Sequence, residues 1–318
     1  MIFQGWHANC ISRFVVHFSF NQKGVFMNTF KKTTLALAIS ALAGGAMAQS
    51  APAPAPAPEK SPISANVTVV NDYRYRGISQ SNFKPAIQGG FDYAHESGFY
   101  IGNWNSSITW ISDAYGASTA TASTISAPVE MDFYAGFKKE LIGEGFASDI
   151  GVLQYYYPIS GTMPAANNTS ARQTGADRQT TNQNPNTTEV YIAQNFTFGP
   201  VNGFVKFSYA LTNLFGFYNS AGSYYPDLTV NYDTGVWGLT LNGHVGYQYI
   251  ANNKPGYDFS YTDYKLGVTK DFGGGLSANV SYVGTNAKTV SGSPLYLAPT
   301  GNKNLGKAGG LVSLTKTF

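Results

Sequence analysis

The chain has 318 residues, among them 20 Lys and Arg and 17 Asp and Glu, and its formal net charge at pH 7 is +3. Only 12% of the residues are charged and 15% are aromatic, whereas a soluble domain averages about 25% charged residues. This composition excludes an ordinary solvated surface, and its aromatic content excludes a disordered chain. The weak net charge, without a basic cluster, argues against a nucleic-acid partner. The single Cys excludes a disulfide framework and a Cys-rich metal site.

The N-terminal part of the chain has the pattern of an export signal. Met27 is followed by two lysines, by an apolar run from Leu35 to Ala43, and by Ala46-Met47-Ala48. A charged start, a short apolar run and small residues at the cleavage site are typical of a secretory signal peptide. We therefore expect residues 1–26 to be an upstream extension and residues 27–48 to be the signal peptide. A membrane-anchoring helix is the less favoured alternative, because a span takes roughly 20 apolar residues.

Cleavage after Ala48 changes the composition of the remaining chain. It removes four of the 20 basic residues and none of the 17 acidic ones, so the net charge falls from +3 to −1. It also removes Cys10, and a chain without thiols suits an envelope compartment. Alternating Ala and Pro over residues 51–58 favours an extended polyproline II spacer. We expect residues 49–65 to form a disordered linker; a ligand for a proline-binding module is the less favoured interpretation.

From residue 66 onward, apolar and polar residues alternate with period two in segments of about ten residues, and no helical periodicity is found. This pattern predicts an all-β fold, an antiparallel transmembrane β-barrel of about 12 strands over residues 66–318. The expected strands are 66–76, 85–95, 98–109, 128–140, 146–157, 187–198, 201–213, 227–236, 238–250, 262–272, 275–284 and 308–318.

The connections between the predicted strands alternate in length. Those after even-numbered strands are short, such as Gly199-Pro200 and Gly273-Gly274, whereas those after odd-numbered strands are long and polar, such as 77–84 and 110–127. Short periplasmic turns, long extracellular loops and an even strand count are the layout of a bacterial outer-membrane barrel. The longest loop, 158–186, is compatible with an inward constriction and equally with a solvated lid.

The chain ends on an amphipathic strand with a terminal aromatic residue. Val312, Leu314 and Phe318 share one face, and Lys316 interrupts that face where snorkelling at the membrane interface would tolerate it. Such an end resembles the signal by which barrels are recognised for membrane insertion. We therefore expect two partners, the barrel-assembly machinery through Phe318 and the lipid of the outer membrane.

Alternation divides the strand residues into a lipid-facing and a lumen-facing set. We expect Val67, Val69, Tyr73 and Tyr75 to face lipid. A charge that faces lipid at mid-bilayer costs about 2–4 kcal/mol, so charged residues within strands are expected inside. The predicted pore-lining residues are Asp72, Arg74, Arg76, Gln88, Asp92, Glu130, Asp132, Lys206, His244, Asp263 and Lys265.

The mixed signs of these inward charges allow two interpretations. As a pore lining, they would set an electrostatic field that selects solutes. As a plug, they would pair across the lumen and fill it. A barrel of about 12 strands lies between the filled eight-stranded barrel and the open sixteen-stranded porin. We favour the pore.

Two segments resemble a known family. The run Val69–Ser81, with Asn71-Asp72-Tyr73-Arg74-Tyr75-Arg76-Gly77 at its centre, resembles the opening segment of the TorF family of porins, and so does Lys84–Trp104. Beyond about residue 110 the likeness lies in the layout of the chain rather than in its residues. The resemblance implies an outer-membrane β-barrel that acts as a porin, without a defined substrate.

The sequence offers no convincing catalytic constellation. Glu130 and Asp132 lie two apart on one strand face, roughly 6.6–6.8 Å along it, which suits a pair of glycosidase carboxylates. Any two residues so placed have this spacing. The positions of His95 and His244 fit neither a barrel protease nor a barrel lipase, and no G-x-S-x-G nucleophile motif occurs. We therefore predict no enzyme activity, no catalytic residues, no cofactor and no metal site.

The predicted function is passive diffusion of small hydrophilic solutes through the narrow, charge-lined lumen of a monomeric outer-membrane porin. The main alternative is a closed structural or adhesive barrel that binds a partner through its extracellular loops. A barrel enzyme is less favoured.

Overall fold

The computed structural model describes residues 61–115, 126–161, 184–253, 256–298 and 303–318. The predicted leader and most of the predicted linker, residues 1–60, lie outside the described residues, and so do residues 162–183 of the longest predicted loop. Among the residues described, no helix has the length and apolarity that a membrane span requires.

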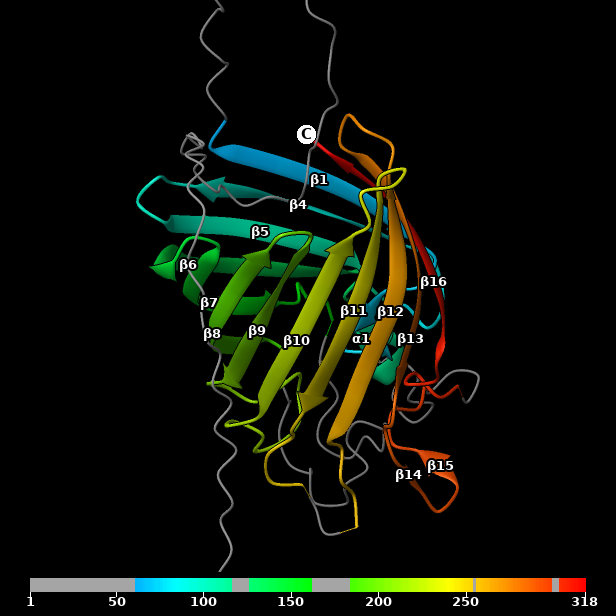
Figure 1. Ribbon diagram of the computed structural model, residues 1–318. Coiled ribbons are helices and arrows are strands. Elements are labelled where there is room, and N and C mark those ends of the chain that lie inside the picture. The colour runs from blue at the N-terminus through cyan, green and yellow to red at the C-terminus, as the bar shows by residue number, and fades with distance from the viewer. Residues whose placement is uncertain (1–60, 116–125, 162–183, 254–255, 299–302) are drawn as a thin grey trace, which may run out of the picture. The chain divides into compact units, whose positions relative to one another are not determined.

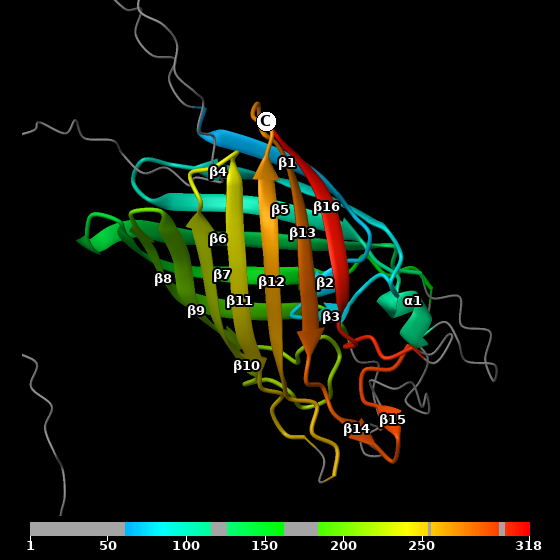
Figure 2. The same cartoon turned by 45° about the vertical axis from the view of Figure 1, so that its right-hand side comes forward.

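Twelve antiparallel strands form a closed barrel, and their order around it is their order in the chain, with β16 closing on β1 (Figures 1 and 2). This confirms the predicted all-β barrel. The wall strands are β1 (Ile63–Val70), β4 (Ala86–Ala94), β5 (Phe99–Ser107), β6 (Val129–Gly143), β7 (Phe146–Tyr156), β8 (Thr187–Phe198), β9 (Val201–Ala210), β10 (Tyr224–Asp233), β11 (Leu239–Gln248), β12 (Tyr261–Asp271), β13 (Leu276–Thr285) and β16 (Gly309–Thr317).

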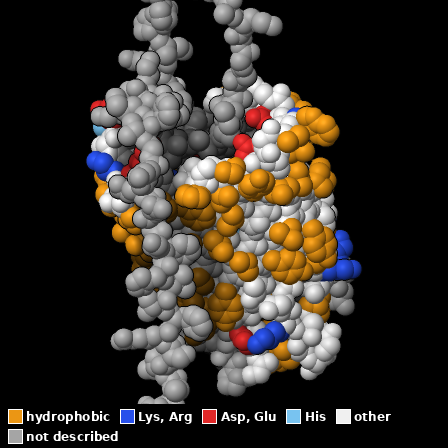
Figure 3. All heavy atoms as spheres, in the orientation of Figure 1, with side chains coloured by type: hydrophobic (Ala, Val, Ile, Leu, Met, Phe, Trp, Pro, Cys, Tyr) orange, Lys and Arg blue, Asp and Glu red, His pale blue; other side chains and the backbone are white. Residues whose placement is uncertain are grey.

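The period-two pattern forms these strands because each one has two unlike faces. In β6, Phe133 and Phe137 are exposed on the outside, whereas Glu130 and Asp132 are buried inside the barrel. Register keeps the two sets apart around the wall, since β11 and β12 place Leu241 opposite Val268 on the outer face. Figure 3 shows hydrophobic side chains over much of one outer face, with charged side chains towards its margins.

The alternation of short and long connections is confirmed. The connections β4–β5, β6–β7, β8–β9, β10–β11 and β12–β13 are short turns at the end of the barrel that also holds the C-terminus (Figure 1). At Gly145 (φ +81°), a Cβ would lie 2.6 Å from the carbonyl oxygen of Thr197, so this turn requires glycine. The small elements belong to the long connections at the other end: β2 (Arg74–Tyr75), β3 (Ile78–Ser79), α1 (Trp110–Tyr115), β14 (Thr289–Val290) and β15 (Ser293–Pro294).

The first predicted strand is wrong at its C-terminal end. β1 stops at Val70, opposite Ala86 of β4, and the chain then leaves the wall and folds into the lumen. There β2 and β3 form a hairpin whose two-residue turn, Arg76-Gly77, has φ of +44° and +78°, as a type I′ turn requires. A hairpin has the same period-two alternation as a wall strand, so the pattern gave no sign of the departure.

This inward turn also corrects two predicted lipid contacts. Tyr73 is buried and Tyr75 is half-buried inside the barrel, where their hydroxyls bond to Glu130 and Tyr155 respectively. Val67 and Val69 do face outward, as predicted. At its other end β1 begins at Ile63 rather than at residue 66, because it already pairs there with Tyr93 of β4.

Candidate functional site: the barrel lumen

The lumen has two parts, which we call the loop half and the turn half after the connections at each end. Residues 71–85, which link β1 to β4 and contain the β2–β3 hairpin, lie in the loop half, and we call them the crossbar. Figure 2 shows β2 and β3 within the outline of the barrel rather than in its wall.

The crossbar carries Arg76 at its tip and places it against the far wall. The Arg76 Nη1 and Nη2 atoms donate to Glu189 Oε1 and Oε2 on β8, at 3.0 and 2.7 Å. Nη1 also donates to the amide oxygen of Gln248 on β11 at 2.5 Å. The guanidinium lies over the rings of Tyr75 and Tyr225, with 4.8 and 4.1 Å to the centroids. The Arg76 and Glu189 side chains are 7% and 2% exposed, so this is a buried, two-pronged ion pair.

Tyrosine hydroxyls satisfy the carboxylates near the crossbar. Tyr73 and Tyr157 donate to the two oxygens of Glu130, at 2.5 and 2.7 Å. Tyr155 lies 2.6 Å from the Tyr75 hydroxyl and donates to Glu189. A buried carboxylate needs such donors, because leaving it without partners costs several kcal/mol.

The base of the crossbar is held by Asp72. The side chains of Ser79 and Ser81 donate to Asp72 Oδ1 at 2.6 and 3.2 Å, and Arg74 pairs with Oδ2 of the same carboxylate. Arg74 Nη1 also donates to the carbonyl oxygen of Lys307, at 3.0 Å. The two predicted pore-lining residues Asp72 and Arg74 thus bind each other, and Arg74 Nη1 also donates to the carbonyl oxygen of Gly77 in the crossbar, at 2.9 Å.

His244 joins two carboxylates on neighbouring strands. Its Nδ1 lies 3.1 Å from Asp227 Oδ1 on β10, and its Nε2 lies 2.8 Å from Asp263 Oδ1 on β12. Asp263 also accepts from the hydroxyl of Tyr225, at 2.9 Å. Lys265, the register partner of His244, is half-buried on the same inner face.

One side of the turn half is lined by uncharged amides, whereas Asp92, Lys138 and Asp149 lie on the inner face of its other side. We call Asn202, Asn231, Asn242 and Asn279 the amide belt: Asn231 donates to Asn202 at 3.1 Å, Asn242 to Asn231 at 2.9 Å, and Asn279 to Asn242 at 3.1 Å. These contacts link β9, β10, β11 and β13, and the belt side chains are half-buried or exposed to the lumen.

The predicted residues of the remaining wall lie on the inner face as well. Gln88 donates to Ser106 at 3.1 Å, and Asp92 accepts from the hydroxyl of Tyr134 at 2.5 Å. Lys206 lies 5.4 Å from the centroid of the inward Tyr191 ring. Asp132 is buried, and within the described residues its Oδ1 has no hydrogen-bond partner.

The sequence prediction missed several inward residues that hold the crossbar, above all Glu189, Tyr155 and Tyr157. A signal for Glu189 was present, since it alternates with the outward Val190 and Ile192 along β8. Its pairing with Arg76 had no signal, because the two residues are 113 positions apart. Among the residues described, no group of three or more His, Cys, Asp or Glu is arranged to hold a metal ion.

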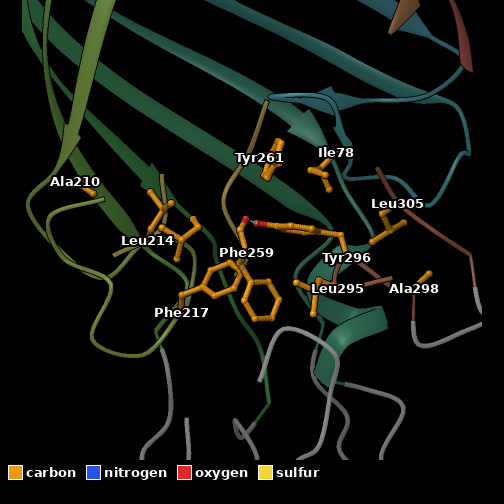
Figure 4. Close-up of a cluster of buried hydrophobic side chains, with 11 residues drawn as sticks. Ile78, Ala210, Leu214, Phe217, Phe259, Tyr261, Leu295, Tyr296, Ala298 and Leu305 are labelled. Carbon is orange, nitrogen blue, oxygen red and sulfur yellow. Dashed lines mark hydrogen bonds between the residues drawn. The ribbon is translucent and has the colours of Figure 1, made fainter. Parts of the chain in front are cut away.

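A packed apolar cluster covers the loop half, and we call it the apolar cap. Its aromatic centre is Phe217, Phe259 and Tyr296, with ring centroids 5.1 Å (Phe217 to Phe259) and 5.7 Å (Phe259 to Tyr296) apart. Tyr296 also donates to the carbonyl oxygen of Phe259 at 2.7 Å (Figure 4). The buried members of the cap are Ile78, Ala210, Leu214, Phe217, Ile250, Phe259, Tyr261, Leu295, Tyr296, Ala298 and Leu305.

The apolar cap and the crossbar are in direct contact, because Ile78 of β3 is a member of the cap. Between them lies a cavity of about 30 Å³, lined among others by Tyr75, Gln80 and Gln248. About 10–15 Å³ is enough to hold one water, so this cavity has room for ordered water between the crossbar and the cap.

Sequence comparison places the chain in a family. A family model described as "Bacterial protein of unknown function (Gcw_chp)" matches residues 55–318, the whole barrel and a few residues before it. The chain belongs to the Gcw_chp family. The family description states no activity. The match to this family therefore does not test the porin function that the resemblance to the TorF family implies. No curated protein matches the chain.

Solved structures that are similar to this Gcw_chp protein include small porins. The KdgM porin is 7% identical, covers 80% of this chain and 99% of its own, and gives a TM-score of 0.47. The NanC porin is 9% identical, covers 80% and 98%, and also gives 0.47. A KdgM porin in complex with disordered oligogalacturonate is 7% identical, covers 80% and 98%, and gives 0.44.

Proposed function

We propose that this protein is an outer-membrane porin through which small hydrophilic solutes pass by diffusion. The observation that carries the proposal is that the wall is closed and that its strands place apolar side chains outside and polar side chains inside. On β12, Leu266 is 68% exposed on the outside, whereas the flanking Lys265 lies on the inner face. A bilayer admits a β-structure only as a closed barrel, with apolar side chains outward and polar ones inward.

The ends of the barrel fit the same orientation in a membrane. Lys316 Nζ donates to the carbonyl oxygen of Gly274 at the turn end, where a lysine reaches the polar interface. Phe318 is 73% exposed at the end of β16, where the barrel-assembly machinery would recognise it. We propose that the turn end faces the periplasm, that the long loops face outward, and that the protein is a monomer.

The side chains inside the lumen would decide which solutes pass. The amide belt offers donors and acceptors without net charge, which keeps the turn half wetted. In the loop half Arg76 is paired with Glu189 and Arg74 with Asp72, so the remaining free cross-section, rather than the field of these four groups, would decide which solutes pass. We propose that this filter lies among the predicted pore-lining residues Asp72, Arg74 and Arg76.

A second candidate is a closed barrel that binds a partner with its loops. The apolar cap favours it, because eleven buried side chains pack over the mouth of the loop half. In that case the ion pairs of the lumen would serve stability only.

Conductance of the purified protein in a planar lipid bilayer separates the two functions. Defined single-channel steps are expected, together with entry of small sugars into liposomes that contain the protein. A folded protein that stays silent in repeated reconstitutions would exclude the porin and leave the closed barrel.

A further inference from the structure

We propose that the crossbar sets the size limit of the pore, with Arg76 as the residue that anchors it to the opposite wall. The inference rests on the proposed function and names the element that determines which solutes pass. It follows from where the crossbar starts, what it contacts and how it is closed at its base.

The crossbar spans the lumen. It leaves the wall after β1, and Arg76 at its tip binds Glu189 on β8. β8 lies five strands from β1 in one direction around the barrel and seven in the other, so the two strands are nearly opposite. A segment that joins opposite walls divides the cross-section, and any solute must pass beside it.

The anchoring contacts reach several wall strands on the far side. Tyr73 bonds to Glu130 on β6, Tyr75 bonds to Tyr155 on β7, and Arg76 bonds to Glu189 and to Gln248 on β11. Contacts to separate strands fix both the depth and the direction of the hairpin. The Arg76 pair is the farthest of these from the base, so it holds the tip.

The crossbar is also closed at its base, independently of the far wall. The backbone N–H of Gln80 donates to the Tyr73 carbonyl oxygen at 2.8 Å, and the Ser81 side chain bonds to the Tyr73 N–H and to Asp72. The ends of the hairpin are therefore neighbours. Residues 73–80 can be replaced by a short link without breaking the wall between β1 and β4.

Two variants remove the crossbar to different degrees. In the first, Tyr73–Gln80 is replaced by two glycines, which takes the hairpin out of the lumen. In the second, Arg76→Ala is combined with Glu189→Ala, so that the anchor is lost and no unpaired buried charge is left behind. The matched control combines Asp258→Ala with Lys288→Ala, which removes an exposed ion pair of 2.5 Å from the loops.

Each purified protein is first shown to be folded by its β-sheet circular dichroism, and is then reconstituted. We expect the hairpin replacement to raise the single-channel conductance at least about threefold, and to admit larger sugars in liposome swelling. The Arg76 and Glu189 variant should give a smaller rise with frequent transitions between conductance levels, since the tip moves while the base holds. The control should conduct like the wild-type protein.

The outcomes separate this inference from the proposed function. If the wild-type protein conducts and the folded hairpin replacement has the same conductance and size limit, the crossbar does not set the aperture, while the porin function stands. If the wild-type protein is silent and the replacement conducts, the crossbar closes the lumen and the native protein is not an open porin. If every folded protein is silent, both proposals fail.

Discussion

The loop half and the turn half of the lumen are built on the same twelve strands, yet they are filled differently. In the loop half, charges such as Arg76 and Glu189 are buried and paired, and the apolar cap lies beside the crossbar. In the turn half, the amide belt lines a wall whose side chains remain half-buried or exposed. The strands alone make a hollow barrel, and the segments inserted between them decide how far each half is filled.

The largest loss of stability is expected when a side chain of the apolar cap, in the loop half, is removed. Phe217→Ala should lower the free energy of unfolding by about 3–5 kcal/mol, because a buried aromatic ring is removed from a packed cluster. The neighbouring Tyr218 is a matched control: it is 41% exposed, against 3% for Phe217, and Tyr218→Ala should cost less than about 0.5 kcal/mol. Urea unfolding of both variants in lipid vesicles measures the difference. Equal losses would mean that the cap is not a packed core.

The next largest loss of stability is expected at the turn of the crossbar. Gly77 has φ +78°, and a Cβ there would lie 2.5 Å from Thr285 and 2.8 Å from Asp263. Gly77→Ala should therefore cost more than the roughly 1 kcal/mol of a glycine with positive φ alone. Gly292, with φ +79° and open space around it, is the control for backbone strain. A Gly77→Ala variant no less stable than Gly292→Ala would show that the hairpin tip is not packed against the wall.

A smaller effect is expected in the turn half. Asn242→Ala removes a side chain that bonds to Asn231, Asn279 and Thr269. Water in the lumen can replace these partners, so the loss in unfolding free energy should be about 0.5–1.5 kcal/mol. A loss as large as that of Phe217→Ala, in the same urea experiment, would mean that the turn half is as tightly filled as the loop half.

The smallest effect is expected outside the lumen, at the exposed pair of Asp258 and Lys288. Partial burial opposes ionisation of Asp258, but hydrogen bonds from Lys288 and Ser260 outweigh it and lower the pKa of that carboxyl. A lowered pKa contributes stability that is present above the ordinary Asp value of about 3.9 and is lost as the pH falls through the folded-state value. Asp258→Asn should therefore shift the urea midpoint slightly at pH 7 and by less at pH 3. An equal shift at both pH values would assign the effect to something other than charge.

The parts of the fold that repeat along the chain were predictable. Strand alternation and loop parity depend on neighbours in sequence, so ten-residue patterns were enough to predict the closed barrel, its strand number and the inner face of residues such as Glu130 and Asp132. The predicted C-terminal end of the first strand was wrong for the same reason. Residues 71–76 alternate like a wall strand, and the pattern does not distinguish a wall from a hairpin inside it.

The sequence by itself determined that this chain forms a two-faced, closed barrel with its sparse charges inside, because a period of two sorts side chains wherever a strand forms. Only the tertiary structure decided that Arg76 crosses the lumen to Glu189 and that four long connections meet in the apolar cap. These contacts join residues far apart in sequence. Their energy depends on burial and on the geometry of both partners, and neither is encoded in a local pattern.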